Sequence, residues 1–112
     1  MIYTVTLNPS LDYLVQTDRL RPGRLCRIHG ETLRPGGKGV NVSLVCAALS
    51  LSTRALGFIA GGTGALFASL LAETGVEYDF CRLGRGMTRI NVKVCAREQT
   101  LSLIHISEPT RH

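Results

Sequence analysis

A glycine-rich segment, Pro35-Gly-Gly-Lys-Gly39, gives the first chemical signal in the sequence. Glycine lets a backbone approach a ligand closely, and free N–H groups at a helix start attract oxygen acceptors. Lys38 and Asn41 add side-chain donors. The segment is no dinucleotide fingerprint, since Val42 replaces the third glycine, and no Walker A loop, since Gly39 follows the lysine. It predicts another kind of ligand-binding loop, and a helix entry with a surface lysine is the alternative.

The hydrophobic pattern predicts an α/β fold that would position this loop. The longer elements alternate as βαβα, which indicates a parallel sheet covered by helices, whereas the short alternating strands are typical of an antiparallel appendage. Thr63 is the predicted N-cap of the second helix, and Gly75 is its predicted stop. Strands are expected at 2–7, 14–17, 26–33, 55–60, 76–83 and 88–96, and helices at 40–51 and 64–74.

The composition bounds the class of protein. With 112 residues, 45% of them hydrophobic, the chain suits one small domain with a buried core. Its net charge of +5 favours anionic partners. The arginines of the first third alternate with apolar residues and glycine, without an aromatic stacking set, so we expect no nucleic-acid partner. A solvated basic face and one phosphometabolite pocket are expected instead.

The cysteines and the N-terminus indicate a compartment. Cys26, Cys46, Cys81 and Cys95 form no Cys-x-x-Cys pair and have no nearby histidine set, so we expect no metal site and buried free thiols. The first residues lack the features of a signal peptide, and no apolar run approaches the ~18 residues of a membrane span. The prediction is a cytoplasmic protein without a membrane partner.

Four segments together resemble the N-terminal part of the PfkB (ribokinase-like) carbohydrate kinases, most of all the 1-phosphofructokinase and tagatose-6-phosphate kinase branch. They occur in the family's order and spacing within residues 1–100. The resemblance implies part of a ribokinase-like parallel-sheet sandwich with a small antiparallel β lid formed by strands near 14–17, 26–33 and 88–96. The segments are Asn8-Pro-Ser-Leu-Asp-Tyr13, Pro35-Gly-Gly-Lys-Gly-Val-Asn-Val-Ser43, Leu56-Gly-Phe-Ile-Ala-Gly-Gly-Thr-Gly64 and Thr88-Arg-Ile-Asn-Val-Lys93.

The resemblance implies roles in sugar binding for five residues. Asp12 would accept hydrogen bonds from sugar hydroxyls, which suits an ionised carboxylate. The turn at Gly36 and Gly37 would let backbone amides reach the sugar, while Lys38 and Asn41 would donate from the helix start. The alternatives are that Asp12 caps a turn and that Asn41 is only a polar residue at a helix start.

Two cations are implied as ligands of the phosphate that the sugar already carries. Arg89 is the main candidate and Lys93 the weaker one, because charge-assisted bonds from guanidinium or ammonium groups suit phosphate oxygens. For Lys93 the alternative is a place on the solvent face of an edge strand.

The sequence departs from the family pattern at three positions. Ala60 stands where the family usually has glycine, and Ser50 stands in a typical Leu-Gly position. Because both replacements are small, they bear on helix ends rather than on the pocket. Cys26 stands where the branch often has asparagine, which puts a secondary polar contact of the lid in doubt.

The catalytic half of such a kinase is not found in this sequence. The family's general base lies in a Gly-Ala-Gly-Asp-like segment of the C-terminal part, near the ATP site. The resemblance implies ATP and Mg²⁺ as cofactors of the full-length enzyme, with no catalytic residue and no bound cofactor in this chain. We expect the chain alone to be inactive, and partly folded or aggregating, because Val5, Leu56 and Phe58 lack their full set of neighbours.

The end of the chain resembles something other than protein. Residues 101–111, Leu-Ser-Leu-Ile-His-Ile-Ser-Glu-Pro-Thr-Arg, match the translation of the transposase mosaic-end adapter used in sequencing libraries. His112 is compatible with the base that follows. We interpret 101–112 as an adapter-derived, non-native tail and exclude it from the fold. Its removal takes away Glu108 and Arg111, so the net charge stays at +5.

The expected function follows from the resemblance. Residues 1–100 would be the N-terminal portion of an ATP-dependent kinase that converts fructose 1-phosphate to fructose 1,6-bisphosphate. The alternatives are a tagatose-6-phosphate or 6-phosphofructokinase of the same family and a non-catalytic phosphosugar-binding module. The full-length enzyme is expected to be a homodimer paired through the lid.

Overall fold

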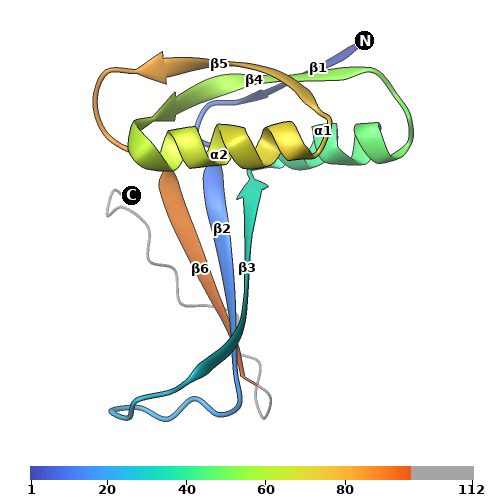
Figure 1. The fold of residues 1–112 in the computed structure, drawn as a ribbon. Coiled ribbons are helices and arrows are strands. Elements are labelled where there is room, and N and C mark those ends of the chain that lie inside the picture. The colour runs from blue at the N-terminus through green and yellow to red at the C-terminus, as the bar shows by residue number, and fades with distance from the viewer. Residues whose placement is uncertain (97–112) are drawn as a thin grey trace. The chain divides into compact units, whose positions relative to one another are not determined.

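A computed structural model describes residues 1–96, which form two compact units (Figure 1). The core unit comprises Met1–Leu11 and Arg34–Arg89, and the lid unit comprises Asp12–Leu33 together with the described residues from Ile90 onward. The predicted α/β class and the separation of the small strands from the main sheet are confirmed. The predicted adapter-derived tail, 101–112, lies outside the described residues.

The core unit is built on a parallel sheet of β1 (Ile2–Thr6), β4 (Thr53–Ala60) and β5 (Glu77–Leu83), in the order β1-β4-β5. The register places Val5 beside Leu56, and Leu56 beside Asp79. Hydrophobic and β-branched runs predicted all three strands, and each begins within two residues of the expected position.

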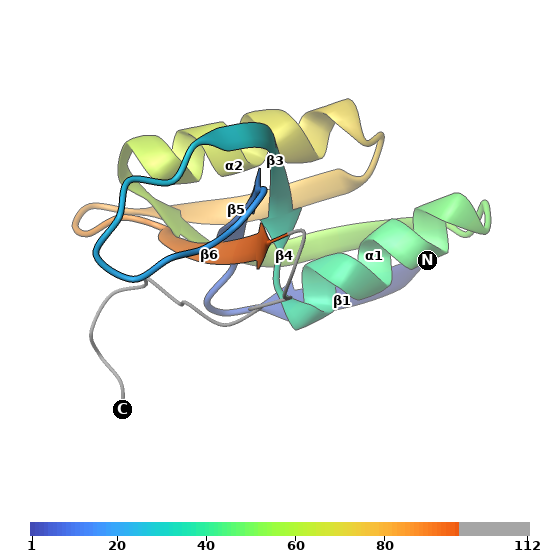
Figure 2. The same cartoon turned by 90° about the horizontal axis from the view of Figure 1, so that it is seen from below.

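Two helices, α1 (Lys38–Ala48) and α2 (Gly61–Glu73), cover one face of this sheet (Figures 1 and 2). Helix α1 lies in the connection from β1 to β4, and α2 connects β4 to β5. Crossover connections between parallel strands are right-handed, and both step in the same direction across the sheet, so both helices lie on the same side. The core fills the space between helices and sheet. Phe67 and Leu71 are fully buried there, and the Phe67 ring meets the Phe80 ring edge-on at 5.3 Å between centroids.

A chain of buried hydroxyls ties α1 to two strands. Thr53 Oγ1 donates to the Ile2 carbonyl at 2.9 Å, so it must accept the bond from Ser43 Oγ, also at 2.9 Å. Ser43 Oγ has then given its only proton and accepts from Thr4 Oγ1 at 2.7 Å. Each of the three hydroxyl groups therefore donates one hydrogen bond. Because every hydroxyl has a partner, these small polar side chains can be buried under a helix.

The helix ends differ in part from the sequence prediction. Thr63 is not an N-cap: Ala60 holds that place without a side-chain bond, because β4 runs directly into α2. Gly75 follows the C-cap with φ +83°, as predicted. Ser50 takes the corresponding position after α1 with φ +61°, a left-handed conformation that favours glycine.

The other face of the core sheet carries exposed apolar side chains. Tyr3 and Val5 are each 62% exposed, Leu7 is 67% exposed and Phe58 is 39% exposed, while Leu56 is half-buried. No helix of the described residues covers this face. The prediction that Val5, Leu56 and Phe58 lack their full set of neighbours is confirmed.

Most of the lid unit belongs to a second sheet, in the order β3-β2-β6, formed by β2 (Ser10–Thr17), β3 (Ile28–Gly36) and β6 (Arg89–Ala96). Thr17 Oγ1 donates to the Arg27 carbonyl at 2.7 Å, so the end of β2 meets the start of β3 and the two strands run antiparallel, as expected. Strand β2 begins four residues before the predicted 14. β3 is displaced toward the C-terminus relative to the predicted 26–33.

The cysteine prediction is only partly correct. The four cysteines are free thiols, but only Cys46 is buried; Cys81 is exposed, and Cys26 and Cys95 are intermediate. Strand β5 lies at the edge of the core sheet, and all of its residues except Phe80 are exposed, which accounts for the exposure of Cys81. Within residues 1–96, no helix has the length and apolar character needed to cross a membrane.

Candidate functional site

The first turn of α1 presents backbone donors, as the glycine-rich segment predicted. Gly37 is the N-cap, with φ +127° and no side-chain cap, and the N–H of Asn41 makes the first helical bond to its carbonyl at 2.8 Å. The N–H groups of residues 38–40 therefore have no helical acceptor. Gly36 is buried, while the Lys38 and Asn41 side chains are exposed. This helix start can receive an oxygen-rich ligand.

Packing also requires glycine in this segment. A Cβ at Gly39 would clash with Thr6 Oγ1 and would lie 2.9 Å from the Val5 carbonyl oxygen. A Cβ at Gly37 would lie 2.7 Å from Thr6 Cγ2. The two glycines thus let α1 begin directly against the end of β1. The sequence predicted either ligand approach or a helix entry for this segment, but it could not show that the glycines make room for Thr6.

Asp12 lies within β2 rather than in a turn. Its side chain is half-buried, and Asn91 Nδ2 on β6 lies 3.4 Å from its Oδ1. Lys93 follows Asn91 by two positions, so both lie on the same face of β6, and Lys93 is exposed. Asn91 was not among the predicted site residues. The period-two spacing of the motif could have indicated it.

Next to Asp12, the Tyr13 hydroxyl donates a hydrogen bond to Glu31 Oε1 on β3. This bond, with smaller contributions from desolvation and from the negative charge of Glu31, raises the pKa of Tyr13 above its ordinary 10.0. The contact ties β2 to β3 beside the candidate carboxylate.

Arg89 is the first residue of β6, and the hydrogen bonds of the preceding residue, Thr88, fix its position. The Ala60 N–H donates to Thr88 Oγ1, and the Thr88 N–H donates to the Ala60 carbonyl, both at 3.0 Å. Arg89 is half-buried, and its Nε is shielded from solvent without an acceptor in the part of the chain that the structure describes. A buried guanidinium N–H without an acceptor is costly, so this group is suited to an anionic ligand.

The structure sorts the predicted residues into two sets. Gly36, Gly37, Lys38 and Asn41 lie together at the start of α1 in the core unit, and Arg89 ends that unit. Asp12 and Lys93 belong to the lid unit. Across residues 1–96, no three His, Cys, Asp or Glu side chains gather in a way that could hold a metal ion.

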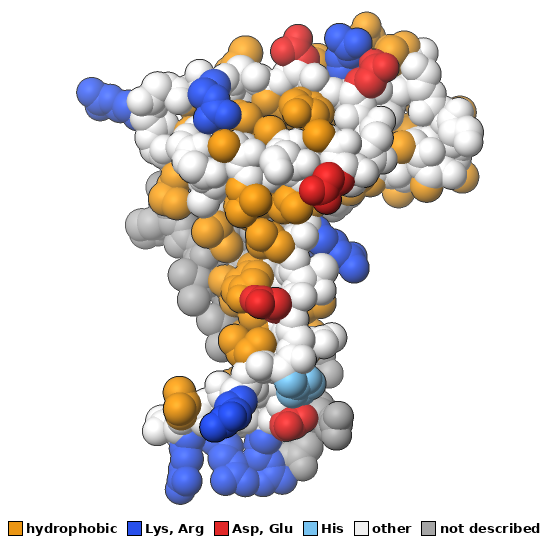
Figure 3. Space-filling view, viewed as in Figure 1, with side chains coloured by type: hydrophobic (Ala, Val, Ile, Leu, Met, Phe, Trp, Pro, Cys, Tyr) orange, Lys and Arg blue, Asp and Glu red, His pale blue; other side chains and the backbone are white. Residues whose placement is uncertain are grey.

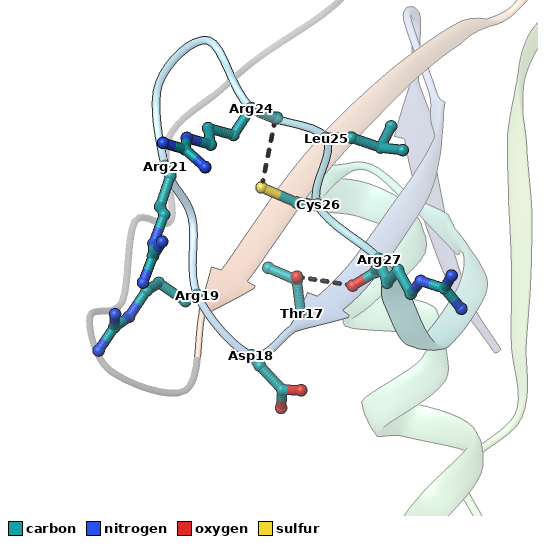
Figure 4. A pocket seen from close by; sticks show the side chains of 8 residues that line it. All are labelled: Thr17, Asp18, Arg19, Arg21, Arg24, Leu25, Cys26 and Arg27. Atoms are coloured by element: carbon teal, nitrogen blue, oxygen red, sulfur yellow. Dashed lines mark hydrogen bonds between the residues drawn. The ribbon is translucent and has the colours of Figure 1, made fainter.

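The loop joining β2 to β3 gathers positive charge that sequence reasoning treated as a solvated face (Figures 3 and 4). An open cavity of about 560 Å³ lies there. Among the described residues, the side chains of Arg21, Arg24 and Arg27 have no ion pair. The lining residues are Thr17, Asp18, Arg19, Arg21, Arg24, Leu25, Cys26 and Arg27.

Comparison with known proteins agrees with the resemblance. The family model described as pfkB family carbohydrate kinase matches residues 6–108. The chain is 44% identical over 100 residues to 1-phosphofructokinase of Bacillus subtilis, which covers 89% of this chain and 33% of that protein. It is 40% identical over 92 residues to D-tagatose-1-phosphate kinase of Bacillus licheniformis, which covers 82% of this chain and 30% of that protein. The chain thus spans about a third of the length of these curated relatives.

Solved structures give the same result for the fold. Phosphofructokinase-2 from Escherichia coli in complex with fructose-6-phosphate matches with a TM-score of 0.85 and 32% identity, over 94% of this chain and 34% of that one. A possible 1-phosphofructokinase from Thermotoga maritima matches with a TM-score of 0.84 and 31% identity, over 97% of this chain and 35% of that one. With its sequence matched over residues 6–108 and its fold shared with these kinases, the chain belongs to the pfkB family of carbohydrate kinases.

Proposed function

We propose that this chain is the acceptor-sugar-binding part of an ATP-dependent sugar-phosphate kinase, and that the acceptor is fructose 1-phosphate. The similarity to 1-phosphofructokinase of Bacillus subtilis supports this choice of sugar. One observation carries the proposal: Arg89, in the family's motif, holds a buried guanidinium N–H without an acceptor among residues 1–96. A phosphate oxygen would satisfy that N–H.

The other proposed roles follow the chemistry of each group. Asp12 accepts hydrogen bonds from sugar hydroxyls, and the first turn of α1, with Gly36, Gly37, Lys38 and Asn41, donates to the ligand. Lys93 is a second phosphate cation. The full-length enzyme uses ATP and Mg²⁺ through residues outside this chain. In residues 1–96 no cluster of acidic or histidine side chains fits a magnesium ion.

The test is an NMR titration of the ¹⁵N-labelled 112-residue chain with fructose 1-phosphate. We expect Arg89→Ala to weaken binding roughly tenfold or more, since bonds to charged groups contribute on the order of 1.5–3 kcal/mol. Arg85→Ala is the matched control, because Arg85 is exposed in the neighbouring turn. The proposal is contradicted if Arg89→Ala and Arg85→Ala lose the same affinity for fructose 1-phosphate. It is also contradicted if the unaltered chain binds inorganic phosphate as tightly as fructose 1-phosphate. Tagatose 1-phosphate and fructose 6-phosphate in parallel titrations identify the preferred sugar.

The chain alone is proposed to be inactive as a kinase. Magnesium-dependent ATP consumption with fructose 1-phosphate, abolished by Asp12→Ala, would contradict this. Reading the genomic DNA beyond the codon for Thr100 tests the assignment to a longer kinase and the adapter origin of 101–112 together. A continuing frame that reaches a Gly-Ala-Gly-Asp-like segment supports both.

Assembly and compartment complete the proposal. We place the full-length enzyme in the cytoplasm, supported by the free cysteines. It pairs as a homodimer through the lid sheet, where Ile28 is exposed. Light scattering of the full-length enzyme tests this pairing, with Ile28→Lys expected to weaken it.

A further inference from the structure

Asn91 is a polar residue of the Thr88–Lys93 motif to which the proposed function assigns no role, whereas Thr88 is bonded to the Ala60 backbone. Side chains alternate between the faces of a strand, so Arg89, Asn91 and Lys93 share one face of β6. Ile90 and Val92 lie on the other face. The motif therefore presents a row of three polar side chains, and Asn91 is its centre.

Asn91 also contacts the candidate sugar-binding carboxylate. Strands β2 and β6 are neighbours in the lid sheet, and Asn91 Nδ2 donates to Asp12 Oδ1 across them at 3.4 Å. Both side chains are half-buried. A carboxylate offers about four acceptor positions, so a bond to one of them orients the group without saturating it.

We propose that Asn91 is a positioning residue for Asp12, holding its carboxylate in the orientation that receives sugar hydroxyls. This inference rests on the proposed function of Asp12. An asparagine amide suits the role better than lysine or arginine, because it donates a directed bond without adding charge that would compete for the phosphate. A hydrocarbon side chain of the same size would fill the space but could not donate this bond to Asp12 Oδ1.

The test compares Asn91→Leu, which keeps the volume and removes the donor, with Cys95→Ser, a change further along the same face of β6. Fructose 1-phosphate and inorganic phosphate are titrated into the 112-residue chain and each variant by NMR. We expect Asn91→Leu to weaken fructose 1-phosphate binding about fivefold to tenfold, as the loss of a bond to a charged group implies. Phosphate affinity and Cys95→Ser should stay unchanged.

A double-mutant cycle separates positioning from a purely structural role. In an Asp12→Ala background, Asn91→Leu should have no further effect on fructose 1-phosphate binding, because there is no carboxylate left to orient. Asn91→Asp supplies a second readout. Its new carboxyl can donate to Asp12 only when protonated, so binding should recover as the pH falls, unlike in Asn91→Leu.

The outcomes are distinct. If the losses of binding from Asn91→Leu and Asp12→Ala are additive, the positioning role is wrong. The same holds if Asn91→Leu weakens fructose 1-phosphate and inorganic phosphate equally. Either result leaves the proposed function standing. Unchanged fructose 1-phosphate binding in a folded Asn91→Leu variant also overturns the positioning role and leaves the proposed function standing. No binding of fructose 1-phosphate by the unaltered chain overturns both.

Discussion

The hydrogen bond from Tyr13 to Glu31 gives the lid unit a pH dependence at the scale of a single residue. Folding raises the pKa of Tyr13, so the neutral phenol contributes its full stabilisation below the ordinary value of 10.0. That contribution is lost as the pH rises through the raised value of the folded state. The ionised phenolate can no longer donate, and it repels Glu31.

We therefore expect the stability difference between the unaltered chain and Tyr13→Phe to shrink as the pH rises above 10.0. Thermal unfolding followed by circular dichroism from about pH 8 to 11 measures it. Tyr3→Phe, at an exposed tyrosine of the core unit, is the matched control. A difference that stays constant through this range would show that the bond does not stabilise the fold.

Residue types could be read from the sequence, but their partners could not. Asp12, Arg89 and the glycine-rich segment were selected because their chemistry suits a sugar phosphate. The Asp12–Asn91 contact joins residues 79 positions apart, and only the pairing of β2 with β6 creates it. The missing acceptor of Arg89 Nε likewise depends on burial, which no local pattern reports.

At the scale of elements, the end of α1 shows how one substitution acts on a helix. The Ser50 N–H donates to the Ala47 carbonyl at 3.0 Å, and the Leu51 N–H donates to the Cys46 carbonyl at 2.8 Å. This is a Schellman motif, whose left-handed residue is usually glycine. Here Ser50 holds it at φ +61°.

Ser50→Gly should therefore stabilise the chain by about 1 kcal/mol, because a left-handed residue with a side chain costs about 1–2 kcal/mol. Chemical unfolding monitored by circular dichroism measures the gain. Ser52→Gly, two positions further at an exposed site with ordinary backbone angles, is the control and should bring no gain. Equal effects of the two changes would refute the role assigned to the left-handed position.

The elements themselves were largely predictable, and the errors have physical causes. Apolar periodicity found every strand and both helices. It placed β2 too late, since Ser10, Leu11 and Asp12 lack a simple alternation and are strand residues only because β3 and β6 flank them. The residue type of Thr63 predicts a cap, whereas the chain already turns into α2 at Gly61, at φ +67°.

At the scale of the whole molecule, the uncovered sheet face decides the solution behaviour of the chain. Tyr3, Val5, Leu7 and Phe58 are exposed apolar side chains, and exposed apolar surface drives association. Charge placed within it should suppress that association. The sequence predicted this exposure because a parallel sheet normally needs cover on both faces.

Val5→Lys should shift the chain toward monomer at concentrations where the unaltered chain self-associates. Size-exclusion chromatography with light scattering provides the measurement. Leu25→Lys is the matched control, since it places the same charge on a 98% exposed leucine in the β2–β3 loop. If Leu25→Lys has the larger effect, the loop rather than the sheet face drives association.

The two-unit division also fixes the order in which the core can assemble. The segment from β4 through α2 to β5 is continuous in sequence, so it closes with short loops. β1 must instead wait for a partner 51 residues away, with the lid strands β2 and β3 intervening. Loop-closure entropy therefore favours docking of β1 after the segment from β4 to β5 has formed.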